Sequence, residues 1–398
     1  MPTGKLPDST INQFLKKNMS TKNFNRRQFV AAASLSSLSA LCIGNTALGA
    51  ELNSEYNSAI KEKPTWKKIG DSIYGAKADE TGPIGGGKGY QNIITSGDYT
   101  VDSLESLIDA LAKAKAGQVV FIPGDKIIDM TTFIYIDKIM LKISEGVTLA
   151  SDRGYNGSEG AQITSDSLDT PGMILINGAN VRISGIRLQG PNPKRYLDHH
   201  KRAFGPGGPG HPYYYKFPTS NGIVCKFPDL EVDNCIITAF AHAGINLQAG
   251  TGHHIHHNLI HRCQYNGLGY GVSHDKASST IEFNQFNENR HSLAGTGSPG
   301  CGYIARNNVE LGISLSHNFD MHGGRDRKDN TTIAGTTMEM YNNTFLGPQR
   351  AVVIRGVPQD KCDVHHNWMP THKDATAAVR AEEKTYTTNN LYADGKVA

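Results

Sequence analysis

Histidine and basic side chains gather in three segments of the sequence, a mixture that suits chemistry on a carboxylate and a neighbouring C–H proton. The segments are GYGVSHDK at 269–276, NRHSLAGTG at 289–297 and FDMHGGRDR at 319–327. β-Elimination from a uronate needs a cation that neutralises the carboxylate, a base that removes the C5 proton and an acid for the leaving oxygen. The sequence does not show which residue has which role. The candidates are Lys226, Tyr270, Arg290, His291 and His322.

Other polar residues in the same part of the chain are candidates for binding a substrate. Two loops, residues 190–220 and 322–335, interrupt an otherwise regular spacing, and long loops commonly carry function. The first loop holds three consecutive tyrosines whose rings suit stacking on sugars. The candidate substrate-binding residues are Tyr214, Tyr215, Gln248, His274, Lys276, Asp320 and Arg325.

Glycoside hydrolysis fits these residues less well than elimination does. It needs two carboxyl groups about 5–9.5 Å apart across the scissile bond, and only Asp275, Asp320 and Asp326 are expected near this face, without an evident pair. Ca²⁺ takes roughly six to eight oxygen ligands, several of them usually carboxylates, and the sequence shows no such cluster. We therefore expect Arg, His or Asn to neutralise the substrate. No metal ligand is assigned, and Ca²⁺ stays open as a cofactor.

The run GHHIHHN at 252–258 has the composition of a metal site. Alternation along a strand, however, sends neighbouring side chains to opposite faces. The run also falls on a different row of strands from the candidates above. The sequence therefore favours structural histidines here over metal ligands.

The elements that would position the candidate residues repeat along the chain. A short apolar strand, an Asn and more apolar residues recur with a spacing of 23 to 35 residues. The equivalent positions are Asn234, Asn258, Asn284, Asn307, Asn342 and Asn367. Such a period indicates one supersecondary unit stacked on the next. Because helical and leucine-rich patterns are missing, the sequence predicts an all-β parallel β-helix in which these Asn residues form a ladder.

In-register stacking would bring distant residues to one face. With Ile223 and Cys225 pointing inward, alternation gives two outward lines. The first line is Lys226, Gln248, Gly271, Thr296, His322 and Arg355, and the second is Val224, Asn246, Gly269, Ala294 and Asp320. Small residues at the centre and cations around the rim suit an extended anionic polymer, with the two long loops as walls.

A helix is expected to cover the first coil. Asp102 and Glu105 have capping-box spacing, and the helix they begin would end at Gly117. With the Asn ladder and the coil length, the chain resembles the pectate-lyase-like superfamily of right-handed parallel β-helices over about residues 95–370. That superfamily holds lyases, hydrolases, epimerases, esterases and phage tailspikes, so the resemblance implies the fold better than the reaction. Lys226 is similar to the outward lysine base of some β-helix alginate and chondroitin lyases.

The first fifty residues resemble a twin-arginine export signal. Arg26 and Arg27 precede an apolar stretch at 30–43, and small residues suit cleavage after Gly49. We expect a signal at 1–49, an N-terminal extension at 50–94 and a catalytic β-helix at 95–398, in a periplasmic or secreted protein. The five cysteines beyond the signal are predicted to be buried free thiols; they are Cys225, Cys235, Cys263, Cys301 and Cys362.

Composition narrows the function classes further. Charged residues are 19% of the chain, against about 25% on average, and 43 residues are Gly, which favours a turn-rich all-β protein. A net charge of +3 gives no reason to expect nucleic acid, and no apolar run is long enough for a membrane span. We predict an exported, monomeric polysaccharide lyase that acts on an anionic, uronic-acid-containing polymer. The alternatives are a uronan C5-epimerase, a glycoside hydrolase and a non-catalytic glycan-binding β-helix.

Overall fold

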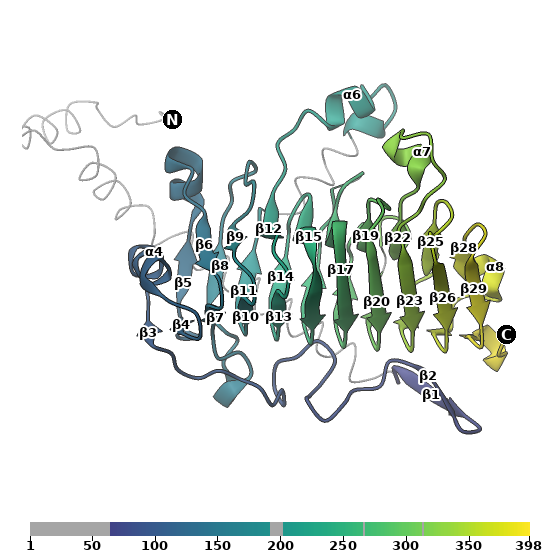
Figure 1. Cartoon of the computed structure of the whole chain (residues 1–398), viewed down its shortest axis with the longest axis horizontal. Coiled ribbons are helices and arrows are strands. Elements are labelled where there is room, and N and C mark those ends of the chain that lie inside the picture. The colour runs from purple at the N-terminus through teal and green to yellow at the C-terminus, as the bar shows by residue number, and fades with distance from the viewer. Residues whose placement is uncertain (1–63, 192–201, 266, 313) are drawn as a thin grey trace, which may run out of the picture. The chain divides into compact units, whose positions relative to one another are not determined.

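Short strands from successive coils stack in register into long parallel sheets, so the protein is a right-handed parallel β-helix (Figure 1). The computed structural model describes residues 64–191, 202–265, 267–312 and 314–398. Each coil contributes to three rows of strands. The first two rows belong to one sheet, because β15 (Ala243–His256) and β17 (Tyr270–Glu282) run through both of them.

The three rows are as follows in chain order. The first row holds β6 (Leu141–Ser144), β9 (Ile174–Asn177), β12 (Asn221–Cys225), the first parts of β15 and β17, β19 (His291–Gly295), β22 (Phe319–Met321), β25 (Val352–Ile354) and β28 (Val379–Arg380). The second row holds β3 (Tyr99–Thr100), β4 (Val119–Phe121), β7 (Thr148–Ala150), β10 (Arg182–Ser184), β13 (Glu231–Asp233), the second parts of β15 and β17, β20 (Gly302–Arg306), β23 (Thr337–Tyr341), β26 (Lys361–His365) and β29 (Thr385–Thr388). The third row holds β5 (Ile127–Asp129), β8 (Gln162–Thr164), β11 (Arg187–Gln189), β14 (Ile236–Thr238), β16 (Leu259–His261), β18 (Gln285–Asn287), β21 (Val309–Glu310), β24 (Thr344–Phe345), β27 (Trp368–Met369) and β30 (Leu391–Tyr392).

The core consists of apolar side chains stacked at the same place in successive coils. Ile223 pairs in register with Ile245, and the line continues through Val272, Leu293 and Phe319. All five side chains are fully buried. Paired strands lie about 4.8 Å apart, so each side chain packs on the one above and the one below. This is the inward line expected from Ile223 and Cys225.

An asparagine ladder runs along the turn between the second and third rows. Each side-chain amide donates to the Oδ1 of the next rung at 2.9–3.1 Å. The rungs are Asn258, Asn284, Asn308, Asn343, Asn367 and Asn390. The predicted rungs Asn307 and Asn342 are wrong by one residue, and Asn234 precedes Cys235, which stands at the rung position of its coil. They take the left-handed backbone conformation that precedes each rung, so the turn and the ladder use two consecutive positions instead of one.

These two positions make a matched pair for a stability test. Asn308 Nδ2 donates to Ile281 O and Asn343 Oδ1, and its Oδ1 accepts from Asn284. Asn308→Ala removes the bonds that the Asn284 backbone amide and Ile281 O make with this side chain, so we expect a loss of about 3 kcal/mol of unfolding free energy. Asn307, at φ 52°, is replaced by Gly without strain, so Asn307→Gly should cost almost nothing. Urea unfolding followed by circular dichroism measures both; equal losses would contradict the assignment of the ladder.

The helix α4 (Leu104–Lys113) covers the first coil and buries Leu107 and Ala110 among other side chains. Its N-cap is Ser103, whose hydroxyl accepts the Ser106 amide while the Ser106 hydroxyl accepts the Ser103 amide. The predicted capping box of Asp102 and Glu105 is therefore wrong by one position, and the helix ends before Gly117. The other short helices are η1 (Phe133–Asp137), η2 (Tyr155–Gly157), α6 (His211–Tyr214), α7 (Gly324–Arg327), α8 (Ala375–Ala378) and η3 (Ala393–Gly395).

The segment before the first coil lies along the outside of the ladder turns. It begins with an antiparallel hairpin of β1 (Trp66–Ile69) and β2 (Ser72–Gly75), beside the late coils in Figure 1. The Ala76 amide donates to Thr344 Oγ1, the Gly85 amide to Phe283 O and the Gly87 amide to Asn234 Oδ1. The extension thus runs back from late coils to earlier ones and fastens several turns together.

Two further predictions concern cysteines and membranes. The five cysteines of the described residues are all buried and free, which confirms that prediction. None of the helices in the described residues is both long and apolar enough to span a membrane. The expected export signal at 1–49 lies outside the described residues.

Candidate functional site

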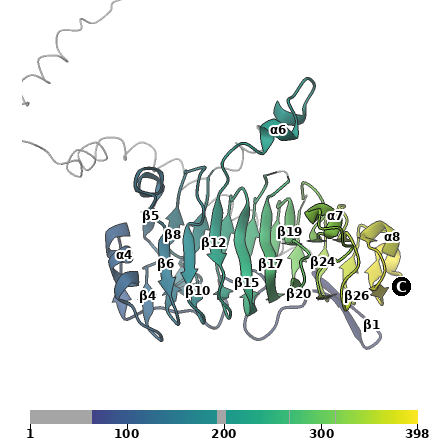
Figure 2. The ribbon, with the colours of Figure 1, turned by 45° about the horizontal axis from the view of Figure 1, so that its top comes forward.

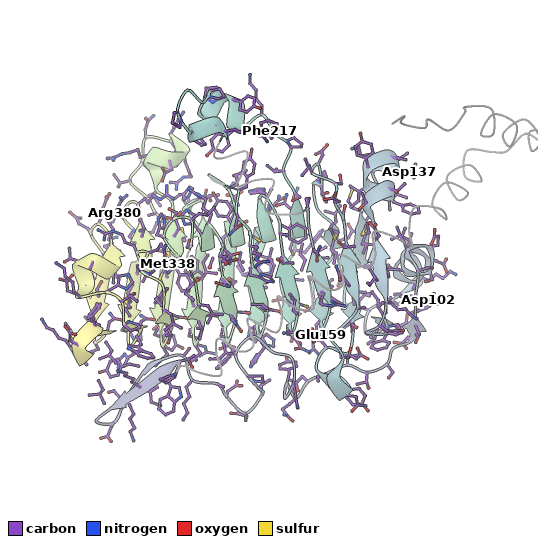
Figure 3. The ribbon with its side chains drawn as sticks, turned by 180° about the vertical axis from the view of Figure 1, so that it is seen from behind. Asp102, Asp137, Glu159, Phe217, Met338 and Arg380 are labelled. Carbon is purple, nitrogen blue, oxygen red and sulfur yellow. The ribbon has the colours of Figure 1, made fainter. Side chains whose placement is uncertain are left out.

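Two long loops adjoin first-row strands. The loop before β12 carries α6, and the loop after β22 carries α7; both stand on the upper side of the coil in Figure 1. In Figure 2, α6 projects away from the strands, whereas α7 lies over later coils. Figure 3 shows Phe217 in the projecting loop, where its ring meets that of Tyr213 edge-on at 5.0 Å. Part of the first loop, residues 192–201, lies outside the described residues.

The outward face of the first row follows the predicted lines except in β17. Tyr270 pairs with Ala243, so Ser273 stands beside Asn246, and Asp275 beside Gln248. The prediction that Gly269 and Gly271 occupy these places is wrong, because Gly269 belongs to the turn and β17 begins only at Tyr270. The centre of the face is consequently polar: Ser273 donates to Asn246, and Asn246 donates to Asn221, each at 3.3 Å.

A buried carboxylate organises the most charged part of this face. Asp320, in β22, is fully buried. Its oxygens lie 2.8 Å from His317 Nε2 and 2.9 Å from His322 Nε2, and Arg355 binds both of them at 2.6 and 2.9 Å. Burial alone would raise the pKa of Asp320, but the hydrogen bonds from the two histidines and the nearby positive charges hold it well below its usual range. We call Asp320, His317, His322 and Arg355 the Asp320 cluster.

His291 and Tyr270 lie against this cluster. His291 is fully buried, its Nδ1 donates to His317 O at 2.6 Å, and its Nε2 lies 3.8 Å from Asp320 without a hydrogen bond among the described residues. Burial lowers the pKa of His291 well below its ordinary value. The Tyr270 ring stacks on the His291 ring, with centroids 6.0 Å apart, and burial raises the pKa of Tyr270. Both side chains are therefore neutral at neutral pH.

The structure brings four of the five predicted catalytic residues together. Tyr270, Arg290 and His291 belong to adjacent coils, and His322 lies one coil further on. The charge of Arg290 acts on Tyr270 and on His291. Lys226 is the exception: it follows Cys225, four strand steps before His322 on the same outward line, which is roughly 19 Å. Lys226 cannot act on the same bond as His322.

The predicted substrate-binding residues differ in how exposed the structure leaves them. His274 is wrong as a rim residue: its ring is buried, its nitrogens contact Ala294 O and Ser279 Oγ, and burial lowers its pKa to about 4. Asp320 is buried and binds the surrounding histidines and Arg355 instead of being exposed to solvent. Gln248 is half-buried, and Lys276 is exposed. Exposed side chains on the loops are Tyr215 and Arg325; Tyr214 lies in α6.

Sequence reasoning missed two members of the Asp320 cluster as site residues. Arg355 directly follows β25, as His322 directly follows β22, so strand pairing places them side by side. His317 belongs to the turn before β22 and carries no strand pattern. Its one signal is its spacing, three residues before Asp320.

Calcium, which the sequence leaves open as a cofactor, is a poor fit to this face. Ca²⁺ takes oxygen ligands, several from carboxylates. Among the described residues, Asp320 already holds Arg355 and two histidines, Asp275 accepts from Thr296, and Asp326 faces Arg355 at 3.5 Å. Carboxylates that already hold these partners offer no cage for a hard cation, and no step of the chemistry is assigned to one.

Comparison with known proteins adds little beyond the architecture. No family model and no curated protein matches the sequence. Among solved structures, an alginate lyase from Paenibacillus sp. str. FPU-7 is 12% identical, with a TM-score of 0.37, over 75% of this chain and 98% of that one. The Family 28 exopolygalacturonase of Yersinia enterocolitica is 11% identical, with a TM-score of 0.47, over 76% and 70%. The Dettilon tailspike protein is 14% identical, with a TM-score of 0.43, over 75% and 59%. Similarity this weak does not distinguish one reaction from another, so the reaction is inferred from the residues of the site.

Proposed function

We propose that the protein is an exported polysaccharide lyase that cleaves a uronic-acid-containing polymer by β-elimination. The observation that supports this most is the Asp320 cluster, in which one ionised carboxylate holds two imidazoles and a guanidinium on the outer face of the first row. A uronate substrate needs a cation near its carboxylate and a base near its C5 proton. Arg355 and His322 are the members that meet these needs, and both are partly exposed.

His322 is assigned the role of base. Arg355 Nη2 lies 3.1 Å from His322 Nε2 but donates to Asp320 at the shorter distance of 2.6 Å. We therefore assign the imidazole proton to Nε2, facing the Asp320 anion at 2.9 Å, which leaves the lone pair on Nδ1. His322 Nδ1 takes the C5 proton, the C–H electron pair becomes the double bond between C4 and C5, and the bond from C4 to the glycosidic oxygen breaks. Arg355 and Arg290 neutralise the substrate carboxylate, which stabilises the carbanion-like transition state.

Tyr270 is assigned the role of acid. Its raised pKa keeps the phenol protonated, so it has a proton to give to the leaving oxygen. His291 stacks on Tyr270 and fixes the His317 backbone through its Nδ1–H. We therefore treat His291 as a positioning residue and not as the base. Lys226, Gln248 and Lys276 would contact sugars further along the chain of the substrate.

The decisive experiment is an activity assay on a panel of polyuronates, including alginate, glucuronan and glycosaminoglycans. A lyase produces an unsaturated uronate, which absorbs in the ultraviolet. Chain shortening with new reducing ends but no such absorbance would indicate hydrolysis, and inverted C5 without shortening, seen by NMR, would indicate an epimerase. Binding without any turnover on the whole panel by folded protein would overturn the enzyme assignment.

Two substitutions separate the base from a distant binding residue. We expect His322→Ala to lower kcat by about 10³-fold, within the range for general acid–base catalysis. Lys226→Ala should raise KM less than tenfold and leave kcat unchanged, because Lys226 lies four strand steps from the base. Steady-state kinetics on the best substrate of the panel measures both. A larger loss of kcat for Lys226→Ala than for His322→Ala would transfer the role of base to the lysine.

A further inference from the structure

A second concentration of polar groups lies on the second row of strands, away from the Asp320 cluster. His254 and His256 are two residues apart on β15, so both point outward, while Glu231 belongs to β13 and Glu282 to β17 on either side. His256 Nε2 lies 3.2 Å from Glu231 Oε1, and His254 Nε2 lies 2.7 Å from Glu282 Oε1. Three consecutive coils thus bring two imidazoles and two carboxylates to one spot.

We propose that Glu231, His254, His256 and Glu282 bind a divalent transition-metal ion, specifically Zn²⁺. One ligand atom each of Glu231, His254 and His256 lies within 4.8 Å of the others. Two imidazole nitrogens and two carboxylate oxygens are a donor set that zinc accepts with tetrahedral geometry. A hard ion such as Ca²⁺ would need more oxygens than this spot supplies.

The surroundings of His256 hold it in the tautomer that a metal ligand needs. His257 Nε2 lies 3.3 Å from Asp79, so that nitrogen donates to the carboxylate and Nδ1 of His257 becomes an acceptor. His256 Nδ1 lies 3.0 Å from His257 Nδ1 and donates to it. The lone pair of neutral His256 is then on Nε2, facing Glu231 across 3.2 Å. Metal-binding histidines commonly donate their other nitrogen in this way.

Two lone pairs facing each other repel unless a positive charge lies between them. That charge is either a metal ion or a second proton on His256, and the second explanation is the rival to the proposal. The site is also open to solvent: a hollow of about 560 Å³ borders His254, Glu282 and Arg306, and one of about 260 Å³ borders Arg182, Glu231 and His254. A hydrated ion can therefore reach His254, Glu231 and Glu282 from solvent, with the buried His256 next to them on β15.

A similar arrangement on another strand of the chain serves as a negative control for zinc binding. On β26, His365 Nε2 lies 3.3 Å from Glu339, and its Nδ1 lies 2.9 Å from His366, which repeats the arrangement around His256. At the place that corresponds to His254, however, that strand carries Asp363, which pairs with Lys361. With one imidazole where the proposed site has two, this second arrangement should not bind zinc.

The test measures zinc binding by the untagged full-length protein after treatment with EDTA, by calorimetry. Cobalt absorption spectra serve as a second readout of tetrahedral coordination. We expect one Zn²⁺ per chain, a dissociation constant at least 100-fold weaker in His254→Ala and His256→Ala, and about tenfold weaker in Asp79→Asn. His365→Ala and Asp320→Asn should bind as the unchanged protein does, which excludes the Asp320 cluster as the site.

Thermal unfolding checks that the variants fold and adds a readout of its own. Zinc should raise the melting temperature of the unchanged protein and of His365→Ala, since it joins three coils, but not that of His256→Ala. Absence of zinc binding, or binding that survives both histidine substitutions, would overturn the proposal. Absence of binding together with a doubly protonated His256 in NMR spectra at neutral pH would establish the rival ion pair.

Discussion

Replacing Asp320 by Asn should lower kcat by about 10³-fold while leaving the fold intact. The carboxylate sets the tautomer of His322, because it accepts the Nε2 proton at 2.9 Å. An amide can present its NH₂ group to that nitrogen, which moves the proton to Nδ1, the atom assigned to take the C5 proton. Losses of this size follow when the carboxylate that orients a catalytic histidine becomes an amide. The amide NH₂ group at the place of Oδ2 also cannot accept from Arg355 Nη2, so Arg355 loses one of its two bonds to residue 320.

Asp363→Asn is the matched control for this experiment. Asp363 is also a strand aspartate with a cationic partner, Lys361 at 2.6 Å, but it lies on the second row. Its replacement should leave kcat and KM unchanged. Far-ultraviolet circular dichroism and melting curves verify that Asp320→Asn folds. If a folded Asp320→Asn variant keeps more than a tenth of the activity, Asp320 does not position the base, and the mechanism proposed here is wrong.

The architecture could be predicted from the sequence because stacked coils require the same residue types at regular intervals along the chain. Each coil must supply inward apolar residues at fixed places, so Ile223, Ile245 and Leu293 recur with the coil length. The Asn residues recur in the same way, because each coil has the same turn before its third-row strand. What the pattern could not separate was which residue of Asn307-Asn308 bends the backbone and which one bonds to the next rung.

The site was harder to predict, because the alternation of inward and outward side chains restarts after every turn. The shift in β17 moved Ser273 to the place expected for Gly269 and sent His274 inward, since a longer turn precedes Tyr270. A Gly followed by a branched apolar residue, as in Gly244-Ile245 and Gly271-Val272, marks the true register. His317 had no such signal, because it lies in a turn and reaches Asp320 through local folding.

Replacing Glu310 by Gln should make the protein more stable at pH 8 but not at pH 4.5. Glu310 points into the core between Phe286 and Phe345 and is 3% exposed. Its Oε1 has no partner among the described residues, and Ser292 donates the hydrogen bond that the carboxyl receives. Burial raises the pKa of Glu310 to about 8, from an ordinary value of 4.5. The folded protein therefore keeps a proton that the unfolded chain loses above pH 4.5.

The sign of the pH dependence follows from that proton. Between pH 4.5 and about pH 8 the folded state binds more protons than the unfolded state, so stability falls as the pH rises, and it levels off above pH 8. Gln has no such proton, and the variant should gain on the order of 2–4 kcal/mol relative to the unchanged protein at pH 8. Melting curves at several pH values test this. Glu383→Gln, at an exposed position, should leave the slope unchanged.

The same carboxyl also connects the core to the candidate site, which gives the substitution a second readout. Ser292, its partner, follows His291 in β19, and the Ser292 amide donates to Asn318 O in the turn that carries His317. Gln can still accept the Ser292 hydrogen bond, whereas Met cannot. We therefore expect Glu310→Gln to keep full activity and Glu310→Met to lose about tenfold in kcat, although both remove the buried acid. Equal activities would show that the bond to Ser292 does not position His291, and an unchanged pH slope in Glu310→Gln would show that Glu310 is not the group that titrates.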